Sequence, residues 1–128
     1  MLWAMNDKTF RLAIQTAKGS PSKKQVGAVL LSKGKVISTA CNLEDKTHPV
    51  QARWARKAGL DPKQYLHAEI AALVRCRRPV DSIVVARVNS EGKLRNSRPC
   101  CLCQLGLRDA GIKQMFYSTN EGFICEKL

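Results

Sequence analysis

Residues 26–40 of this chain read VGAVLLSKGKVISTA. Val26 to Leu31 and Val36 to Ala40 are two runs rich in β-branched and aliphatic residues, and Lys33-Gly34-Lys35 between them is a short glycine turn. Two such runs around a short glycine turn are typical of a β-hairpin. This hairpin gives the first two strands of a sheet, and the other elements are interpreted outward from it.

Helical patterns flank the hairpin on both sides. Before it, apolar residues recur at helical spacing from Phe10 to Ala17, which predicts an amphipathic helix that Asn6 or Asp7 can cap. After it, a second helical stripe begins at His67 and leads into a nearly continuous apolar run, Ile83 to Val88, which we expect to be a buried strand.

The C-terminal third predicts one more helix and two more strands. The helix covers Leu102 to Ala110, and the fourth strand covers Ile112 to Tyr117. Only Ser118 to Gly122 separates that strand from Phe123 to Glu126, which is too short for a crossover helix, so the last strand should return antiparallel. The sequence therefore predicts an α/β fold with a mixed five-stranded sheet, in a single domain spanning residues 1–128.

The longest predicted connection, residues 42–66, is polar, basic and interrupted by Pro49, Gly59 and Pro62. We expect a loop with one or two helical turns near residues 52–58. A loop of this length is usually functional. Within it, Trp54 and Tyr65 either stack on a base or anchor the loop.

The composition indicates a globular protein with a phosphate-bearing partner. Apolar residues make up 45% and charged residues 25%, which excludes a disordered or fibrous chain. No apolar run approaches the roughly 20 residues of a membrane span, so no membrane role is expected. The net charge of +12 favours a nucleotide or a nucleic acid as partner. The first residues lack the pattern of a secretory signal, so the expected location is cytoplasmic.

Three residues are candidates for holding a metal ion. His67 stands at one predicted helix start, and Cys100 and Cys103 share one face of the first turn of another, where the helix dipole favours thiolates. Two thiolates and a neutral imidazole suit Zn²⁺, and three protein ligands leave a fourth position open, as in catalytic zinc sites. The alternative is a closed structural site, in which Cys101 replaces Cys100 or adds a fourth ligand.

The order of these motifs, H-A-E at residues 67–69 and then P-C-C-L-C at residues 99–103, fits the H-x-E and P-C-x-x-C signature of zinc nucleobase deaminases. The chain resembles the cytidine and deoxycytidylate deaminase superfamily. Further matching segments are residues 26–29, Asn42 and residues 111–113. The resemblance implies a three-layer α/β/α fold with the metal between the N-termini of the second and third helices.

The resemblance also implies roles for individual residues. Glu69 would move a proton from water to the cytosine ring and then to the departing amine, which leaves uracil and ammonia. Asn42 would hydrogen-bond the sugar, and Ala68 would contact the base through its backbone. The implied zinc ligands are His67, Cys100 and Cys103.

Basic and polar residues of the 42–66 connection are expected to complete the substrate site. His48 is a candidate substrate contact, and Arg53 and Arg56 are candidates for holding a 5′ phosphate. The expected substrate is a free cytidine-type nucleotide or nucleoside, with deoxycytidylate as the leading compound, because an antiparallel last strand resembles the free-nucleoside branch of the superfamily. The resemblance further implies a homo-oligomer.

Two other functions compete with this one. A cytosine or adenosine deaminase acting on single-stranded DNA or RNA would also use the net charge of +12, because Lys and Arg neutralise the backbone. A zinc-stabilised binding module without catalysis is the third hypothesis.

Overall fold

The structure is a computed structural model that describes residues 2–3 and 7–128. No helix within these residues has both the length and the apolar character needed to cross a membrane. The elements in chain order are β1 (Leu2–Trp3), α1 (Lys8–Lys18), β2 (Gln25–Ser32), β3 (Lys35–Cys41), α2 (Pro49–Lys57), α3 (Ala68–Arg75), β4 (Ser82–Val88), β5 (Leu94–Arg95), α4 (Cys101–Asp109), β6 (Gln114–Thr119) and β7 (Gly122–Lys127).

The strands form one mixed sheet in the order β1-β7-β6-β4-β2-β3, with β5 paired to β4. Strands β4 and β6 are parallel, and β7 runs antiparallel to β6, as predicted. Within the described residues the sheet has seven strands instead of the predicted five. Both additions, β1 and β5, are two residues long, and so short a segment has no periodic pattern that a sequence can display.

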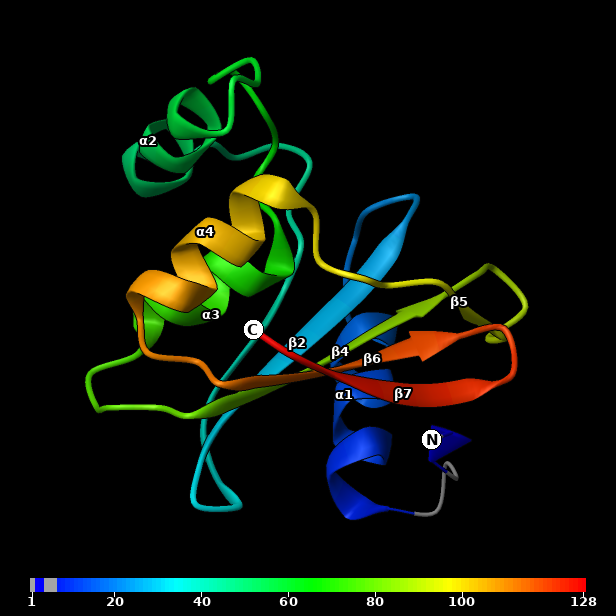
Figure 1. The fold of residues 1–128 in the computed structure, drawn as a ribbon. Coiled ribbons are helices and arrows are strands. Elements are labelled where there is room, and N and C mark those ends of the chain that lie inside the picture. The colour runs from blue at the N-terminus through cyan, green and yellow to red at the C-terminus, as the bar shows by residue number, and fades with distance from the viewer. Residues whose placement is uncertain (1, 4–6) are drawn as a thin grey trace.

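Helices cover both faces of the sheet, so the predicted three-layer α/β/α arrangement is confirmed (Figure 1). Helix α1 packs on one face, and α3 and α4 lie on the other, with α2 resting on α3 and α4. Alternation along β2 separates two cores: Ala28 and Leu30 face the α3 and α4 side, whereas Val29 and Leu31 face α1. All four side chains are at most 5% exposed.

The hairpin and the first helix form as the sequence predicts. Residues Lys33 and Gly34 close the β2–β3 turn with φ values of 50° and 79°, in the left-handed region that glycine adopts without strain. Asp7 is the N-cap of α1, and its carboxylate accepts hydrogen bonds from the backbone N–H groups of Thr9 and Phe10.

The connection between β3 and α3 contains a nine-residue helix, α2, where the sequence predicted a loop with one or two helical turns. Pro49 does not break the helix but occupies its first turn, where its missing N–H is no loss and its fixed φ suits the helix. His48 precedes it as the N-cap, and its Nδ1 accepts from the backbone N–H of Val50 at 3.1 Å. His48 and Pro49, which the sequence places in a loop, therefore start a helix.

Gly27 of β2 lies directly against the backbone of α1. A Cβ atom at Gly27 would be 2.4 Å from the backbone nitrogen of Ala17 and 2.6 Å from the carbonyl oxygen of Ala13.

We expect Gly27→Ala to lower the free energy of unfolding by about 3 kcal/mol or more, because backbone atoms of a helix cannot move away locally. Denaturant unfolding of the wild type and the variant measures this difference in the free energy of unfolding. The control is Gly34→Ala, where a Cβ meets no atom within 4 Å and only the positive φ costs about 1 kcal/mol. Equal losses in the two variants would contradict the close packing of α1 on β2.

Candidate metal centre

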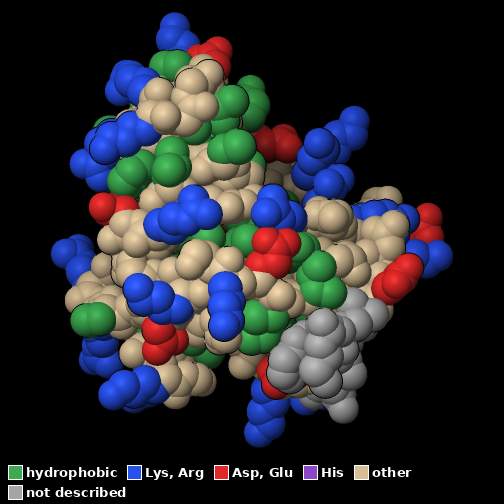
Figure 2. Space-filling model, viewed as in Figure 1, with side chains coloured by type: hydrophobic (Ala, Val, Ile, Leu, Met, Phe, Trp, Pro, Cys, Tyr) green, Lys and Arg blue, Asp and Glu red, His purple; other side chains and the backbone are tan. Residues whose placement is uncertain are grey.

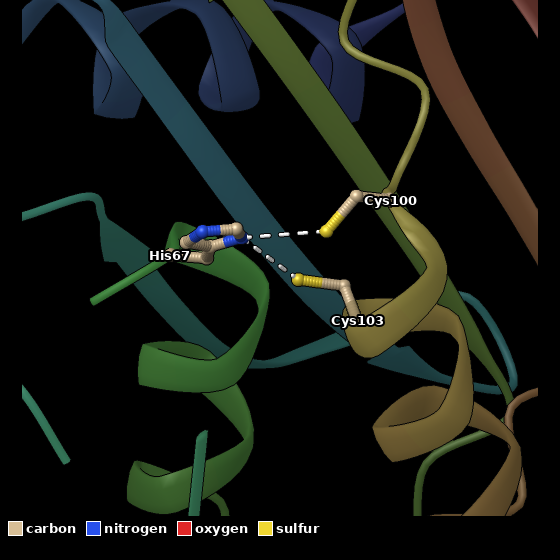
Figure 3. Close-up of side chains that lie close together, drawn as sticks. All are labelled: His67, Cys100 and Cys103. Atoms are coloured by element: carbon tan, nitrogen blue, oxygen red, sulfur yellow. Dashed lines mark hydrogen bonds between the residues drawn. The ribbon is translucent and has the colours of Figure 1, made fainter. Parts of the chain in front are cut away.

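The N-termini of two helices meet at one point on the α3 and α4 side of the sheet. His67 is the N-cap residue of α3 and Cys100 is the N-cap residue of α4, yet neither side chain caps its helix. Both side chains point instead toward each other and toward Cys103, in the first turn of α4 (Figure 3). The first backbone N–H groups of a helix lack partners within it, so both termini bring partial positive charge to this cluster.

The three side chains are close enough to share one ion. Nδ1 of His67 lies 3.3 Å from Sγ of Cys103 and 3.6 Å from Sγ of Cys100. All three ligand atoms lie within 4.8 Å of one another. One imidazole nitrogen and two sulfurs form a donor set that Zn²⁺ prefers, and they leave one tetrahedral position for another group. Cys101 is exposed and does not belong to this group.

The surroundings of the two cysteines shift their pKa values in opposite directions. A hydrogen bond from the Cys103 thiol lowers the pKa of Cys100 from 9.0 to about 4, against the opposing effect of burial, and His67 adds to this lowering. Burial raises the pKa of Cys103 well above 9.0. Because Zn²⁺ binds thiolates, its binding would require that the Cys103 thiol lose its proton.

Glu69 lies beside these ligands, in the first turn of α3. Its side chain is 6% exposed, and this burial raises its pKa although the charge of His67 opposes the shift. Burial alone would lower the pKa of His67, but a hydrogen bond with Cys100 and the charges of Glu69 and Cys100 raise it. A carboxyl group with a raised pKa next to a metal ligand set is suited to accept and return a proton.

A cavity of about 630 Å³ opens beside the cluster. His67, Glu69 and Cys100 line it, whereas Cys103 is fully buried behind them. Its cationic lining residues are Lys24, Lys63, Arg87 and Arg98. The cavity thus combines the open side of a metal site, a buried carboxyl group and positive charge.

Asn42 and Ala68, the predicted contacts to the sugar and the base, both line this cavity. The Asn42 amide is already used in part: Oδ1 accepts from Ser20 and from the backbone of Val26, and Nδ2 donates to the carbonyl of Lys24 at 2.7 Å. These bonds hold residues 20–26 against the end of β3. Ala68 is the first residue of α3, so its backbone N–H is among those without a partner inside the helix.

His48, Arg53 and Arg56 are not among the residues that line the cavity. The reason is the formation of α2, which uses the His48 side chain as its cap and leaves both arginines exposed. The guanidinium of Arg53 lies over the Trp54 ring, 5.0 Å from its centroid. Trp54 is 7% exposed and anchors α2, whereas Tyr65 is 63% exposed at the cavity.

Several residues that support the site carry no signal in the sequence. Ser97 and Ser118 are buried and hydrogen-bonded to each other at 2.8 Å, which ties the segment before Cys100 to β6. Arg98 binds Glu126 of β7 through two hydrogen bonds of 2.9 and 3.1 Å. These contacts join residues 21 and 28 positions apart, so only the fold reveals them.

The α/β/α fold with its His/Cys/Cys group between two helix N-termini defines a zinc-binding protein of the deaminase type. The family model for the cytidine and deoxycytidylate deaminase zinc-binding region matches residues 4–119, and the chain belongs to this family. Membership supports a zinc-dependent hydrolase that deaminates cytosine. A comparison with curated protein sequences found no match.

Solved structures share the fold. A cytidine deaminase from Mycobacterium tuberculosis is 23% identical, with 91% of this chain and 89% of that chain covered and a TM-score of 0.50. A dCMP deaminase from the cyanophage S-TIM5, in apo form, is 21% identical, with 84% and 79% covered and a TM-score of 0.48. The first of these likenesses supports the α/β/α architecture.

Proposed function

We propose that this protein converts the cytosine of a free cytidine-type nucleotide, with deoxycytidylate as the leading substrate, to uracil with release of ammonia. One observation carries this proposal: the buried carboxyl group of Glu69 and the His67, Cys100 and Cys103 cluster meet at a cavity with a cationic lining. In this proposal residues 1–128 act as one zinc-dependent deaminase domain in the cytoplasm, where reducing conditions keep the ligand thiols available. The family resemblance supports a homo-oligomer.

His67, Cys100 and Cys103 are the proposed zinc ligands. When bound, zinc supplies a Lewis acid that makes water nucleophilic at neutral pH. Glu69 accepts a proton from the water that attacks C4 of the ring and passes it to the adjacent ring nitrogen. Glu69 then takes the proton of the C4 hydroxyl and delivers it to the amine, so that the C4–N bond breaks, a C4 carbonyl remains and ammonia leaves.

The remaining lining residues bind and orient the substrate in this proposal. Asn42 offers its second Nδ2 hydrogen to the sugar, and Ala68 offers its backbone N–H to the base. The phosphate is assigned to cations of the cavity, chiefly Lys24 and Lys63, which are both exposed at its edge. These lysines replace Arg53 and Arg56 as the proposed phosphate contacts.

Product formation by the purified, zinc-loaded protein tests this function. We expect uracil-containing product from deoxycytidylate, and a KM for deoxycytidine about tenfold higher, because one lost phosphate contact is worth about 1.4 kcal/mol. The Lys63→Gln variant should shrink this difference between the two substrates. Lys8→Gln, on α1 across the sheet, is the matched control and should leave it unchanged.

A second cavity gives specific support to a nucleic-acid substrate as the alternative. It measures about 600 Å³ and shares Arg98 and Cys100 with the first. Lys57 and Arg108 add further positive charge there, and Figure 2 shows Lys and Arg side chains gathered around α2. A strand of single-stranded DNA or RNA would occupy both cavities, with cytosine or adenine as the target base.

Parallel reactions with deoxycytidylate and a cytosine-containing single strand at physiological salt separate the two functions. Turnover of the strand alone, falling steeply as salt increases, would transfer the assignment to a nucleic-acid deaminase, because several phosphate contacts release counterions. Turnover of the mononucleotide depends on few contacts and should change little with salt. If neither cytosine compound reacts, a reaction with an adenine-containing single strand tests whether the protein deaminates adenosine in a nucleic acid.

A further inference from the structure

Gln51 is a glutamine on α2 that is 1% exposed and uses both ends of its side-chain amide. Oε1 accepts a hydrogen bond of 2.7 Å from the backbone N–H of His67. Nε2 donates to the backbone carbonyls of Gln64, at 3.3 Å, and of Tyr65. An amide nitrogen has two hydrogens, so both are used, and the three partners fix the orientation of the amide.

Two of these partners, Gln64 and Tyr65, belong to one short segment, residues 64–66, which we call the strap, and the third is His67 directly after it. The strap forms part of the cavity wall and leads directly into His67. Its other side is also bonded, since the N–H of Leu66 donates to the carbonyl of Lys46 at 2.8 Å and the carbonyl of Leu66 accepts from Leu43 at 3.0 Å. Gln51 therefore supplies the inner set of hydrogen bonds that holds the strap in place.

The helix that carries Gln51 rests on the helix that carries the two cysteines. Trp54, one turn further along α2, packs against Gly106 of α4, where an added Cβ would lie 3.3 Å from the indole ring. Gln51 thus connects the backbone of His67 to an element seated on α4.

We propose that Gln51 is a positioning residue for both the metal centre and the substrate cavity. Its acceptor holds the backbone of His67 at the start of α3, and its donors hold the strap that walls the cavity. This inference rests on the proposed role of His67 as a zinc ligand. Loss of the acceptor should weaken zinc binding, and loss of the donors should weaken substrate binding.

Two substitutions separate these effects. Gln51→Met keeps the length of the side chain but removes all three hydrogen bonds, so we expect the Kd for zinc in a chelator competition to increase about tenfold or more. We also expect KM to increase about tenfold and the His67 amide to exchange its hydrogen faster. Gln51→Glu keeps an acceptor for His67 but lacks the two donors, so KM should increase while zinc affinity stays closer to that of the wild type.

The control is Val84→Ala, which removes buried methyl groups on the α1 side of the sheet and should lower the unfolding midpoint alone. If Gln51→Met loses stability like this control while zinc affinity, KM and His67 exchange stay at wild-type values, the residue is only structural and the inference fails. Should Gln51→Glu not fold, the zinc affinity and KM of Gln51→Met still show whether Gln51 is a positioning residue or only a structural one. Zinc affinity and amide exchange need no turnover, so a wild-type protein without deaminase activity would overturn the proposed function separately.

Discussion

Glu69→Gln is expected to lower kcat by roughly 10²- to 10⁴-fold while the protein retains one zinc ion per chain. The substitution preserves the shape of the side chain, but an amide can neither accept the proton of the attacking water nor return it to the amine. The carboxyl group is 6% exposed beside the ligand cluster, so bulk solvent is poorly placed to replace it. Steady-state rates with deoxycytidylate and metal analysis of the same sample measure both quantities.

The matched control for this variant is Glu121→Gln. Glu121 is an exposed carboxylate in the turn between β6 and β7, so its neutralisation should leave both the rate and the zinc content unchanged. If Glu69→Gln kept wild-type turnover with zinc bound, the proton transfer would have to be assigned to another group. If instead the zinc-loaded wild type turned over no cytosine or adenine substrate, a zinc-stabilised binding module without catalysis would become the better description.

The second large effect is expected from Cys103→Ser, which should raise the Kd for zinc by roughly 10²-fold or more and remove detectable turnover. Changes around metal ligands already cost about 10–100-fold, so the loss of a direct ligand should cost at least as much. A serine hydroxyl stays protonated near neutral pH and is a poor ligand compared with a thiolate. Chelator competition and zinc content per chain give the result.

Cys101→Ser is a closely matched control for this change, because Cys101 is two residues away and in the same helix. Its side chain is exposed and lies outside the group of ligand atoms that surround His67. Zinc affinity and turnover should therefore remain at wild-type levels. A loss of zinc in Cys101→Ser instead would support the closed structural site with a fourth protein ligand.

The sequence predicts those parts of the fold that have a repeating pattern. The hairpin of β2 and β3, helix α1 and the antiparallel return of β7 all follow from periodicity and loop length. Strands β1 and β5 are too short to show a period. The length of helix α2 is greater than the sequence predicts. A histidine followed by a proline occurs both in loops and at helix starts, and only the backbone conformation distinguishes these two cases.

The candidate site likewise contains some residues that the sequence reveals and one that it does not. His67, Glu69, Cys100 and Cys103 are brought together by two local motifs at helix N-termini, so their spacing in the sequence carries the information. Gln51 reaches His67 from 16 positions away, through a helix that the sequence did not reveal in full. A buried glutamine has no distinguishing neighbours in a sequence, because its partners are backbone atoms.

The sheet separates the chemistry from the smaller of the two hydrophobic clusters. The cluster around Phe10, Val29 and Val84 lies on the α1 side, while the ligand residues and the cavity lie on the other. For protein engineering this means that stabilising substitutions can be accumulated on the α1 side with little coupling to the reaction, because distant sites are usually additive. Such a stabilised background would tolerate a saturation library of the cavity wall, in which variants with altered substrate preference are otherwise lost through unfolding.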